Sequence, residues 1–292
     1  MDSTEAYKKA GRIHREVCAE LRERLRPGMT LLEIAAFAEA RIRALGGNLA
    51  FPVNTSLNDI AAHYVPIHED PKTLQAGDLL KLDLGVRVDG YVADGAFTYC
   101  SAPSPLARAA EEAIRAAVQV IRPGVTVGQV SDAIEASVRA AGFGLIVNLT
   151  GHGVDQEQFH AEPTVPNRAT HSPVILEEGM AIAIEPFVSP ANGTVRDAAP
   201  VEIYRLLRPV PVRMPEARAI LQRIQEEYGA FPFAKRWLCD SFSPLRVSLA
   251  LKQLEAAGAL ERYPPLKDPT GQRIAQAEHT ILVGDPPVVI TG

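Results

Sequence analysis

The sequence predicts an α+β protein in which one unit of helices and strands occurs twice with pseudo-twofold symmetry, and a helical subdomain is inserted in the second copy. Three observations support this fold class. A helical segment at 25–47 recurs at 121–143. Each copy is followed by a short apolar strand that carries one acid, and residues from about 200 to 270 interrupt the second unit before its last strand.

The N-terminal segment predicts two helices. We expect the first from about Ser3 to Leu25, because Pro27 and Gly28 end the helical pattern. The second begins at Thr30, which forms a capping box with Glu33. Apolar residues at helical spacing on the second helix indicate one face that packs on a core.

The second helix returns later in the chain. LRPGMTLLEIAAFAEARIRALGG at 25–47 matches IRPGVTVGQVSDAIEASVRAAGF at 121–143, with Arg, Pro, Gly, Thr, Glu, Arg and the closing Gly at a constant offset of 96 (121 − 25). We therefore interpret the two halves as copies of one unit.

The strand after each copy carries an acid at one equivalent point. In LQAGDLLKLDLG at 74–85 and LEEGMAIAIEPF at 176–187, Asp83 and Glu185 each stand six positions after a glycine. Both runs are short, apolar and bounded by Gly or Pro, which predicts buried strands. An isolated acid most often ends its strand in water or pairs with arginine, but two acids at matching points favour a shared axis and a cation there.

The chain after Asp83 predicts a tight hairpin. Asp89 and Gly90 separate two alternating runs, and as the two loop residues they would place Gly85 opposite Asp94. Asp83 and Asp94 then share a face as diagonal neighbours, close enough to bind one ion or bridge two. Without a cation their charges would repel each other, and one carboxyl would have to protonate.

The second acid pair is expected across the interruption. AQAEHTILVG at 275–284 has strand composition and carries Glu278, which we pair with Glu185. One histidine would complete a dinuclear site, and NLTGHGVDQEQFH offers His152 and His160, with His63 as a further candidate. The glycines beside His152 favour close approach to a ligand. The remaining candidates are interpreted as structural or exposed: His68, His171 and His279.

Composition narrows the class of protein. The net charge of -5 provides no general basic field, so we expect no nucleic-acid partner. Three scattered cysteines form neither a disulfide framework nor a zinc motif, and a reducing compartment fits them. The charged N-terminus lacks a signal peptide's apolar region, and no run is long enough to span a membrane. We expect a soluble, cytoplasmic protein without membrane attachment.

Five motifs together resemble the successive signatures of methionine aminopeptidases, members of the "pita-bread" metallopeptidases. They are HYVP near 63, KLDLGVRVDGYVAD at 81–94, NLTGHG at 148–153, AIEPF at 183–187 and AEHTILV at 277–283. The motifs span nearly the whole chain, and the interruption before the last Glu resembles the short, archaeal-like type II form.

The resemblance implies roles for specific residues. The implied metal ligands are Asp83, Asp94, His152, Glu185 and Glu278. The implied catalytic residues are His63, His160 and Glu185, and the implied substrate-binding residues are His63, His160, Phe51 and Tyr263. For the two aromatic residues, ordinary packing remains the alternative. Gly95 stands where the family leads us to expect threonine, which we expect to loosen the strand that carries Asp94.

The resemblance also implies a domain division. Residues 1–200 and 270–292 are expected to form the catalytic pita-bread domain, and residues 201–269 a winged-helix-like insertion with helices near 216–228 and 244–257. No basic recognition helix is evident in the insertion. We therefore expect it to be structural and to help form the pocket.

The implied activity is removal of the N-terminal methionine from nascent proteins whose second residue is small. Two divalent ions, drawn from Co, Mn, Fe or Zn, would activate a bridging water to attack the first peptide bond. Nascent polypeptide N-termini are the expected partners, ribosome association is left open, and a monomer is expected. Two alternatives stay open: an Xaa-Pro dipeptidase or aminopeptidase, and an inactive binding protein of the same fold.

Overall fold

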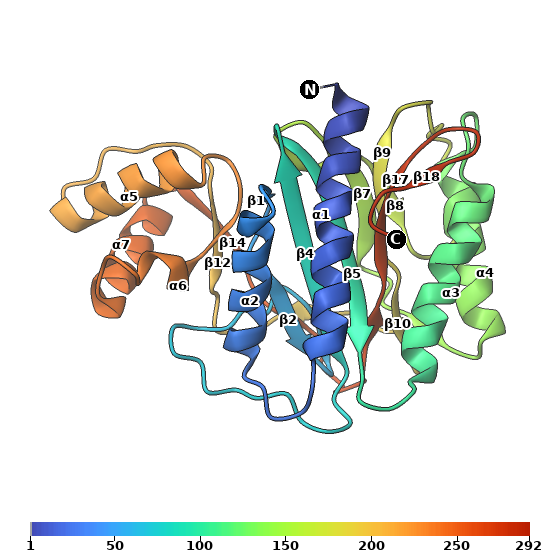
Figure 1. Ribbon diagram of the computed structural model, residues 1–292, viewed down its shortest axis with the longest axis horizontal. Coiled ribbons are helices and arrows are strands. Elements are labelled where there is room, and N and C mark those ends of the chain that lie inside the picture. The colour runs from blue at the N-terminus through green and yellow to red at the C-terminus, as the bar shows by residue number, and fades with distance from the viewer. Residues whose placement is uncertain (1) are drawn as a thin grey trace.

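A computed structural model describes residues 2–292, and its main feature is a curled antiparallel sheet covered on one face by helices (Figure 1). The sheet order is β1-β4-β5-β17-β9-β7-β8, with β2 beside β4 and β18 beside β17. Its strands are β1 (Asn48–Leu49), β2 (Asn54–Leu57), β4 (Leu80–Val88), β5 (Tyr91–Tyr99), β7 (Thr150–Asp155), β8 (Gln158–Pro166), β9 (Ala181–Ile184), β17 (Glu278–Leu282) and β18 (Val288–Val289).

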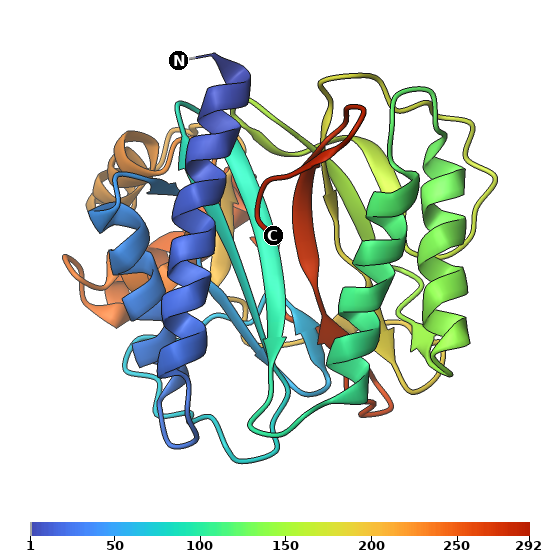
Figure 2. The ribbon, with the colours of Figure 1, turned by 45° about the vertical axis from the view of Figure 1, so that its right-hand side comes forward.

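Two helix pairs cover the outer face of this sheet, one pair over each half (Figure 2). They are α1 (Ser3–Arg24) with α2 (Leu31–Ala44), and α3 (Pro105–Val120) with α4 (Val127–Ala140). The helices α2 and α4 have equal length and lie at the predicted offset of 96 (127 − 31). Each begins with a complete capping box, Thr30 with Glu33 and Thr126 with Gln129. The predicted duplication is confirmed.

The duplication continues beyond the helices. The turn before each one donates a backbone hydrogen bond to the loop ahead of the acid-bearing strand, Gly28 N to Leu74 O at 2.8 Å and Gly124 N to Leu176 O at 2.9 Å. Under α1 and α2 lies one apolar core, and under α3 and α4 lies another. The two units therefore place their strands in equivalent positions.

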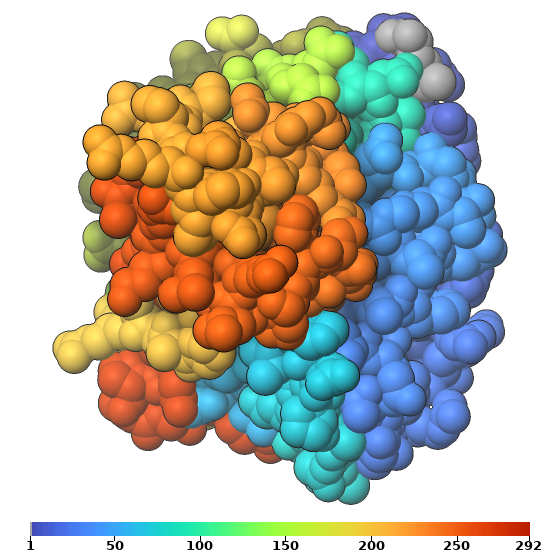
Figure 3. Space-filling view, turned by 90° about the vertical axis from the view of Figure 1, so that its left-hand side faces the viewer, coloured from blue at the N-terminus to red at the C-terminus, as the bar shows by residue number. Residues whose placement is uncertain are grey.

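A smaller unit stands to one side of the sheet (Figure 1). It contains β12 (Ile203–Leu206), β13 (Phe233–Ala234) and β14 (Leu260–Tyr263) as a separate sheet, with α5 (Pro215–Glu227), α6 (Lys235–Leu238) and α7 (Pro244–Ala256). Both expected helices are present, and the unit has its own apolar core. Figure 3 shows it packed against the segments of the N-terminal half.

The remaining strands form two small sheets. One contains β6 (Gly144–Leu145), β10 (Phe187–Ser189) and β16 (Ala275–Gln276), and the other contains β3 (Ile60–Ala62), β11 (Arg196–Asp197) and β15 (Leu266–Lys267). The strand predicted within 275–284, with Glu278 on it, is confirmed, but the segment is divided into two strands, β16 and β17. The chain leaves β16 at Ala277 and enters the large sheet as β17, because the two segments pair with different partners. Over residues 2–292, no helix combines the length and apolar composition that crossing a bilayer requires.

Candidate metal centre and substrate pocket

The β4–β5 hairpin carries the first two acids, and its geometry is the one that the sequence predicts. Asp89 and Gly90 have φ angles of 50° and 85°, as a two-residue turn of this type requires. Gly85 pairs with Asp94, and Asp83 pairs with Ala96, two positions from Asp94. The two aspartates are therefore diagonal neighbours on one face of the sheet.

The second pair of acids is brought to the same place by β17. This strand lies between β5 and β9, with Glu278 opposite Ala96 and His279 opposite Ile184. Glu185 directly follows Ile184, and its charge acts on Glu278. The four acids that the sequence analysis grouped thus meet at the centre of the sheet.

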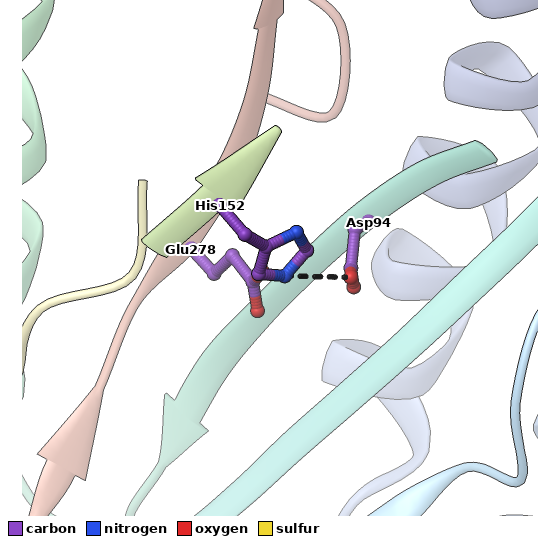
Figure 4. Close-up of side chains that lie close together, drawn as sticks. All are labelled: Asp94, His152 and Glu278. Carbon is purple, nitrogen blue, oxygen red and sulfur yellow. Dashed lines mark ion pairs between the residues drawn. The ribbon is translucent and has the colours of Figure 1, made fainter. Parts of the chain in front are cut away.

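His152 lies on β7 with its ring directed at the acids (Figure 4). Its Nε2 atom is 3.8 Å from Asp94 Oδ2 and 3.5 Å from Glu185 Oε1. Nδ1 donates a hydrogen bond to the Gly153 carbonyl at 2.9 Å, which leaves the lone pair on Nε2 facing the acids. Ligand atoms of Asp94, His152 and Glu278 all lie within 4.8 Å of one another.

The electrostatics of this cluster favour a cation. Burial raises the pKa of Asp83 to about 7, and burial together with the neighbouring acids raises the pKa of Asp94, Glu185 and Glu278. In the described part of the chain, the buried Oδ1 atoms of Asp83 and Asp94 have no hydrogen-bond partner. Carboxylates with unsatisfied oxygens beside a neutral imidazole suit one or two divalent ions.

Two side chains hold the strand that carries Asp94. Its backbone N–H donates to Thr280 Oγ1 at 2.7 Å, and this hydroxyl donates back to the Asp94 carbonyl at 2.8 Å. The ring of His14 occupies the space beside Gly95, where an added Cβ would lie 2.8 Å from His14 Cε1. The glycine therefore leaves room for the His14 ring, and β5 keeps its pairing with β4 on both sides of Asp94.

The glycines that flank His152 have a different role from the one that we expected. An added Cβ at Gly151 would lie 2.2 Å from the Ala183 carbonyl oxygen, and one at Gly153 would lie 2.1 Å from the Glu162 carbonyl oxygen. Both glycines allow close contact between neighbouring strands rather than the approach of a ligand.

The two further histidines line the cavity beside the acids. The ring of His160 packs edge-on against His152 with centroids 4.4 Å apart. His63 has a φ of 63°, and its backbone N–H donates to Asn54 Oδ1. Its Nδ1 donates to the Pro264 carbonyl at 3.2 Å, so Nε2 is left as an acceptor. Burial lowers the pKa of His63 to about 4, and burial beside His152 and His63 lowers the pKa of His160.

A cavity of about 60 Å³ adjoins the acids. Phe51 and Tyr263 line it, as expected, together with both histidines and all the predicted ligands. Sequence reasoning missed further lining residues: Asn54, Ala62, Phe159, Ile203 and Pro232. Phe159 could have been noticed as the neighbour of His160. Nothing in the local sequence marks Ile203 or Pro232, which come from the smaller unit.

Comparisons with known proteins agree with this geometry. The model of metallopeptidase family M24 matches residues 5–229. Methionine aminopeptidase from Thermococcus kodakarensis is 46% identical over 286 residues, with 97% of each chain covered. The chain belongs to the methionine aminopeptidases of family M24. The family resemblance drawn from the five motifs is thereby confirmed, and the chain is a metal-dependent aminopeptidase by family.

Other members of the family support the assignment. Methionine aminopeptidase from Archaeoglobus fulgidus is 44% identical, covering 97% of this chain and 96% of that protein. Methionine aminopeptidase 2-1 from Aspergillus flavus is 32% identical, covering 97% of this chain and 69% of that protein.

Solved structures confirm the pita-bread fold. A methionine aminopeptidase from Thermotoga maritima has a TM-score of 0.71 at 24% identity, with 98% of this chain and 95% of that chain covered. A thermophilic Arx1 has a TM-score of 0.87 at 17% identity, covering 100% and 91%. The prolidase from Pyrococcus furiosus has a TM-score of 0.62 at 18% identity, covering 100% and 64%. At these identities the likeness concerns the fold alone.

Proposed function

We propose that this chain removes the N-terminal methionine from polypeptides whose second residue is small, using two divalent ions. The observation that carries the proposal is the meeting of four acids and His152 beside a small aromatic cavity that His63 and His160 also line. The five residues come from β4, β5, β7, β17 and the end of β9. Membership of the methionine aminopeptidases supports methionine over the Xaa-Pro alternative. The chain has all five predicted metal ligands, which argues against an inactive binding protein.

The ions would be held by Asp83, Asp94, His152, Glu185 and Glu278. When bound, they would polarise the scissile carbonyl and make water nucleophilic at neutral pH. The oxygen-rich donor set with one imidazole accepts Co, Mn, Fe or Zn. Because the carboxyl groups must ionise to act as ligands, uptake of metal would release protons from the groups whose pKa burial raises.

Three residues would act on the substrate. Glu185 lies at the end of β9 beside the cavity, and we assign it the transfer of the proton from water to the leaving amine. His63 presents Nε2 as an acceptor for the scissile amide N–H, because its other nitrogen is bound to Pro264. His160 lies beside His152, where a donor would stabilise the developing oxyanion.

The cavity walls would select the substrate. Phe51 and Tyr263 provide an apolar surface for a methionine side chain, with Phe159 between them. We assign residues 201–269 to an inserted subdomain that completes this pocket, since Ile203 and Tyr263 reach it from there. The substrates would be nascent chains in the cytoplasm, processed by a monomer.

The proposal is tested by peptide cleavage after chelation, with each metal added back in turn. We expect Met-Ala-Ser to be cleaved only in the presence of metal. Met-Asp should be refused, because a larger side chain meets the strand of His160 and its charge is repelled by the nearby carboxylates. Equal cleavage of Met-Ala and Met-Asp would overturn the pocket. Cleavage of Ala-Pro without cleavage of Met-Ala would favour the proline-specific enzymes.

A further inference from the structure

The tips of two hairpins meet at one edge of the molecule, although β17 and β9 separate their strands in the sheet order. One is the β4–β5 hairpin and the other is the β7–β8 hairpin. Glu157 N donates to the Gly90 carbonyl at 2.8 Å, and Gln156 Nε2 donates to the Asp89 carbonyl at 3.1 Å. In Figure 3 these two segments lie side by side at the top of the molecule, next to the smaller unit.

The contact between the tips is close. Gly90 has a φ of 85°, and an added Cβ there would lie 2.5 Å from Glu157 Oε1. Glu157 itself has a φ of 58°, a left-handed conformation that is uncommon for a glutamate. Two and three residues after Glu157 the chain reaches Phe159 and His160, which line the cavity. The tip contact is therefore coupled to the cavity through one short stretch of β8.

Arg87 lies where this contact meets the smaller unit. Its Nη1 atom is 3.4 Å from Glu157 Oε2, and its guanidinium carbon lies 4.0 Å from the ring centroid of Phe231. Phe231 belongs to the smaller unit, is only 2% exposed, and packs in one apolar cluster with Phe51 and Phe159. A guanidinium can cover a ring with its face while its edge donates to a carboxylate, which lysine cannot do.

We propose that Arg87 is a positioning residue for the substrate pocket, fastening the β7–β8 hairpin through Glu157 and the smaller unit through Phe231. Arg87 lies on β4, the strand that also carries Asp83, so one rigid strand sets both the acids and the cavity walls. The inference rests on the proposed function in assigning this cavity to the first side chain of the substrate. With a cavity of only about 60 Å³, small displacements of its walls change what fits.

The two contacts of Arg87 differ in weight. The Glu157 side chain is 59% exposed, so solvent screens its ion pair, and such pairs contribute little. The Phe231 ring is buried, and a cation over a desolvated ring is held more strongly. The stack on Phe231 should therefore matter more than the pair with Glu157.

The test compares Arg87→Met, Arg87→Lys and Glu157→Gln with the control Arg108→Met, which breaks an exposed arginine–glutamate pair on α3. We expect Arg87→Met to raise KM for Met-Ala-Ser by roughly tenfold with kcat changed less than about twofold, and to weaken the preference for Met over Leu at the first position. Arg87→Lys should recover little of this loss, and Glu157→Gln should change KM by less than about threefold. Metal affinity, measured by calorimetry, should stay as in the unaltered protein.

Hydrogen–deuterium exchange separates this inference from the proposed function, because it needs no substrate. Faster exchange in 228–233, with a smaller increase in 155–160, is the expected result for Arg87→Met, and neither change is expected in Arg108→Met. Unchanged exchange of both segments in Arg87→Met would overturn the positioning role. A parallel decrease of kcat, metal affinity and Tm in this variant would also overturn it, because it would indicate general destabilisation. If the unaltered protein cleaves no methionyl peptide, the proposed function fails, while the exchange result still decides whether Arg87 fastens the two segments.

Discussion

The two halves of the molecule each supply two acids to one centre, but they do so by different routes. In the first half, Asp83 and Asp94 lie on adjacent nine-residue strands joined by a two-residue turn. In the second half, Glu185 follows a four-residue strand and Glu278 begins a five-residue strand, with the smaller unit between them in the sequence. The first pair is thus held by local geometry, and the second depends on tertiary packing.

The interruption of the second half does not keep its last strand out of the large sheet. The strand β17 pairs with β9 of its own half and with β5 of the other half. It therefore joins the two copies, as its counterpart β5 does from the first half by pairing with β4 and β17. A duplicated unit can supply a symmetric set of ligands even when one copy is interrupted, provided that its last strand returns to the sheet.

The strongest test of this comparison removes one acid from each half. Asp94→Ala and Glu278→Ala should each abolish turnover, by roughly 10³-fold or more, because each would remove a ligand of the proposed metal centre. Circular dichroism should show both variants folded, and calorimetry should show weaker metal binding. If Glu278→Ala unfolds while Asp94→Ala does not, the second pair is a structural element rather than a matched ligand.

The next test concerns the histidines beside the centre. His160→Ala should lower kcat by roughly 10²- to 10³-fold with metal content retained, because its assigned role is to stabilise the oxyanion. Metal content is measured by elemental analysis of the purified variant. Loss of metal from His160→Ala would contradict this role and indicate that His160 is a metal ligand.

The junction between the smaller unit and the first half can be broken at one buried pair. Glu39 on α2 accepts hydrogen bonds from the Arg236 guanidinium, at 3.1 Å from Nη1, and from Trp237 Nε1 at 2.9 Å. Arg236→Met leaves this buried carboxylate without its cation and should cost roughly 3–5 kcal/mol in free energy of unfolding. Urea denaturation measures the loss, and Arg262→Met, at an exposed pair, is the control.

Removal of metal should make stability depend on pH through the acids. The pKa of Asp83 is raised to about 7 in the folded chain from its ordinary value of 3.8, so folding favours its neutral form. Stability of the metal-free protein is therefore lost as pH rises from about 4 through about 7. Asp83→Asn should raise the Tm of metal-free protein at pH 8 and leave it unchanged at pH 4. With metal present at pH 8 the order should reverse.

The smallest expected effect tests whether the capping boxes of α2 and α4 contribute equally to stability. Thr30→Ala and Thr126→Ala each remove the first hydroxyl of a capping box, and each should lower Tm by roughly 2–4 °C. Scanning calorimetry of the two variants provides a matched pair. Losses that differ by several degrees would show that the two copies no longer contribute equally.

Features with short-range causes could be predicted from the sequence. The turn at Asp89 and Gly90 sets the register that makes Asp83 and Asp94 diagonal neighbours, because a two-residue loop leaves the strands one way to pair. The capping boxes mark where α2 and α4 begin, since their hydrogen bonds join residues three apart. The matching acids followed from the repeat itself.

Only the tertiary structure decided which distant segments contact one another around the cavity. The sequence does not show that Ile203 and Pro232 line the cavity, that Arg87 covers Phe231, or that His14 fills the space beside Gly95. These contacts join segments far apart in the chain, and no local periodicity or turn chemistry encodes which surfaces meet. The sequence by itself determined the repeat and the acids at its matching points, because both can be read directly from the order of residue types. The shape of the pocket was decided by packing, which many residue types can satisfy.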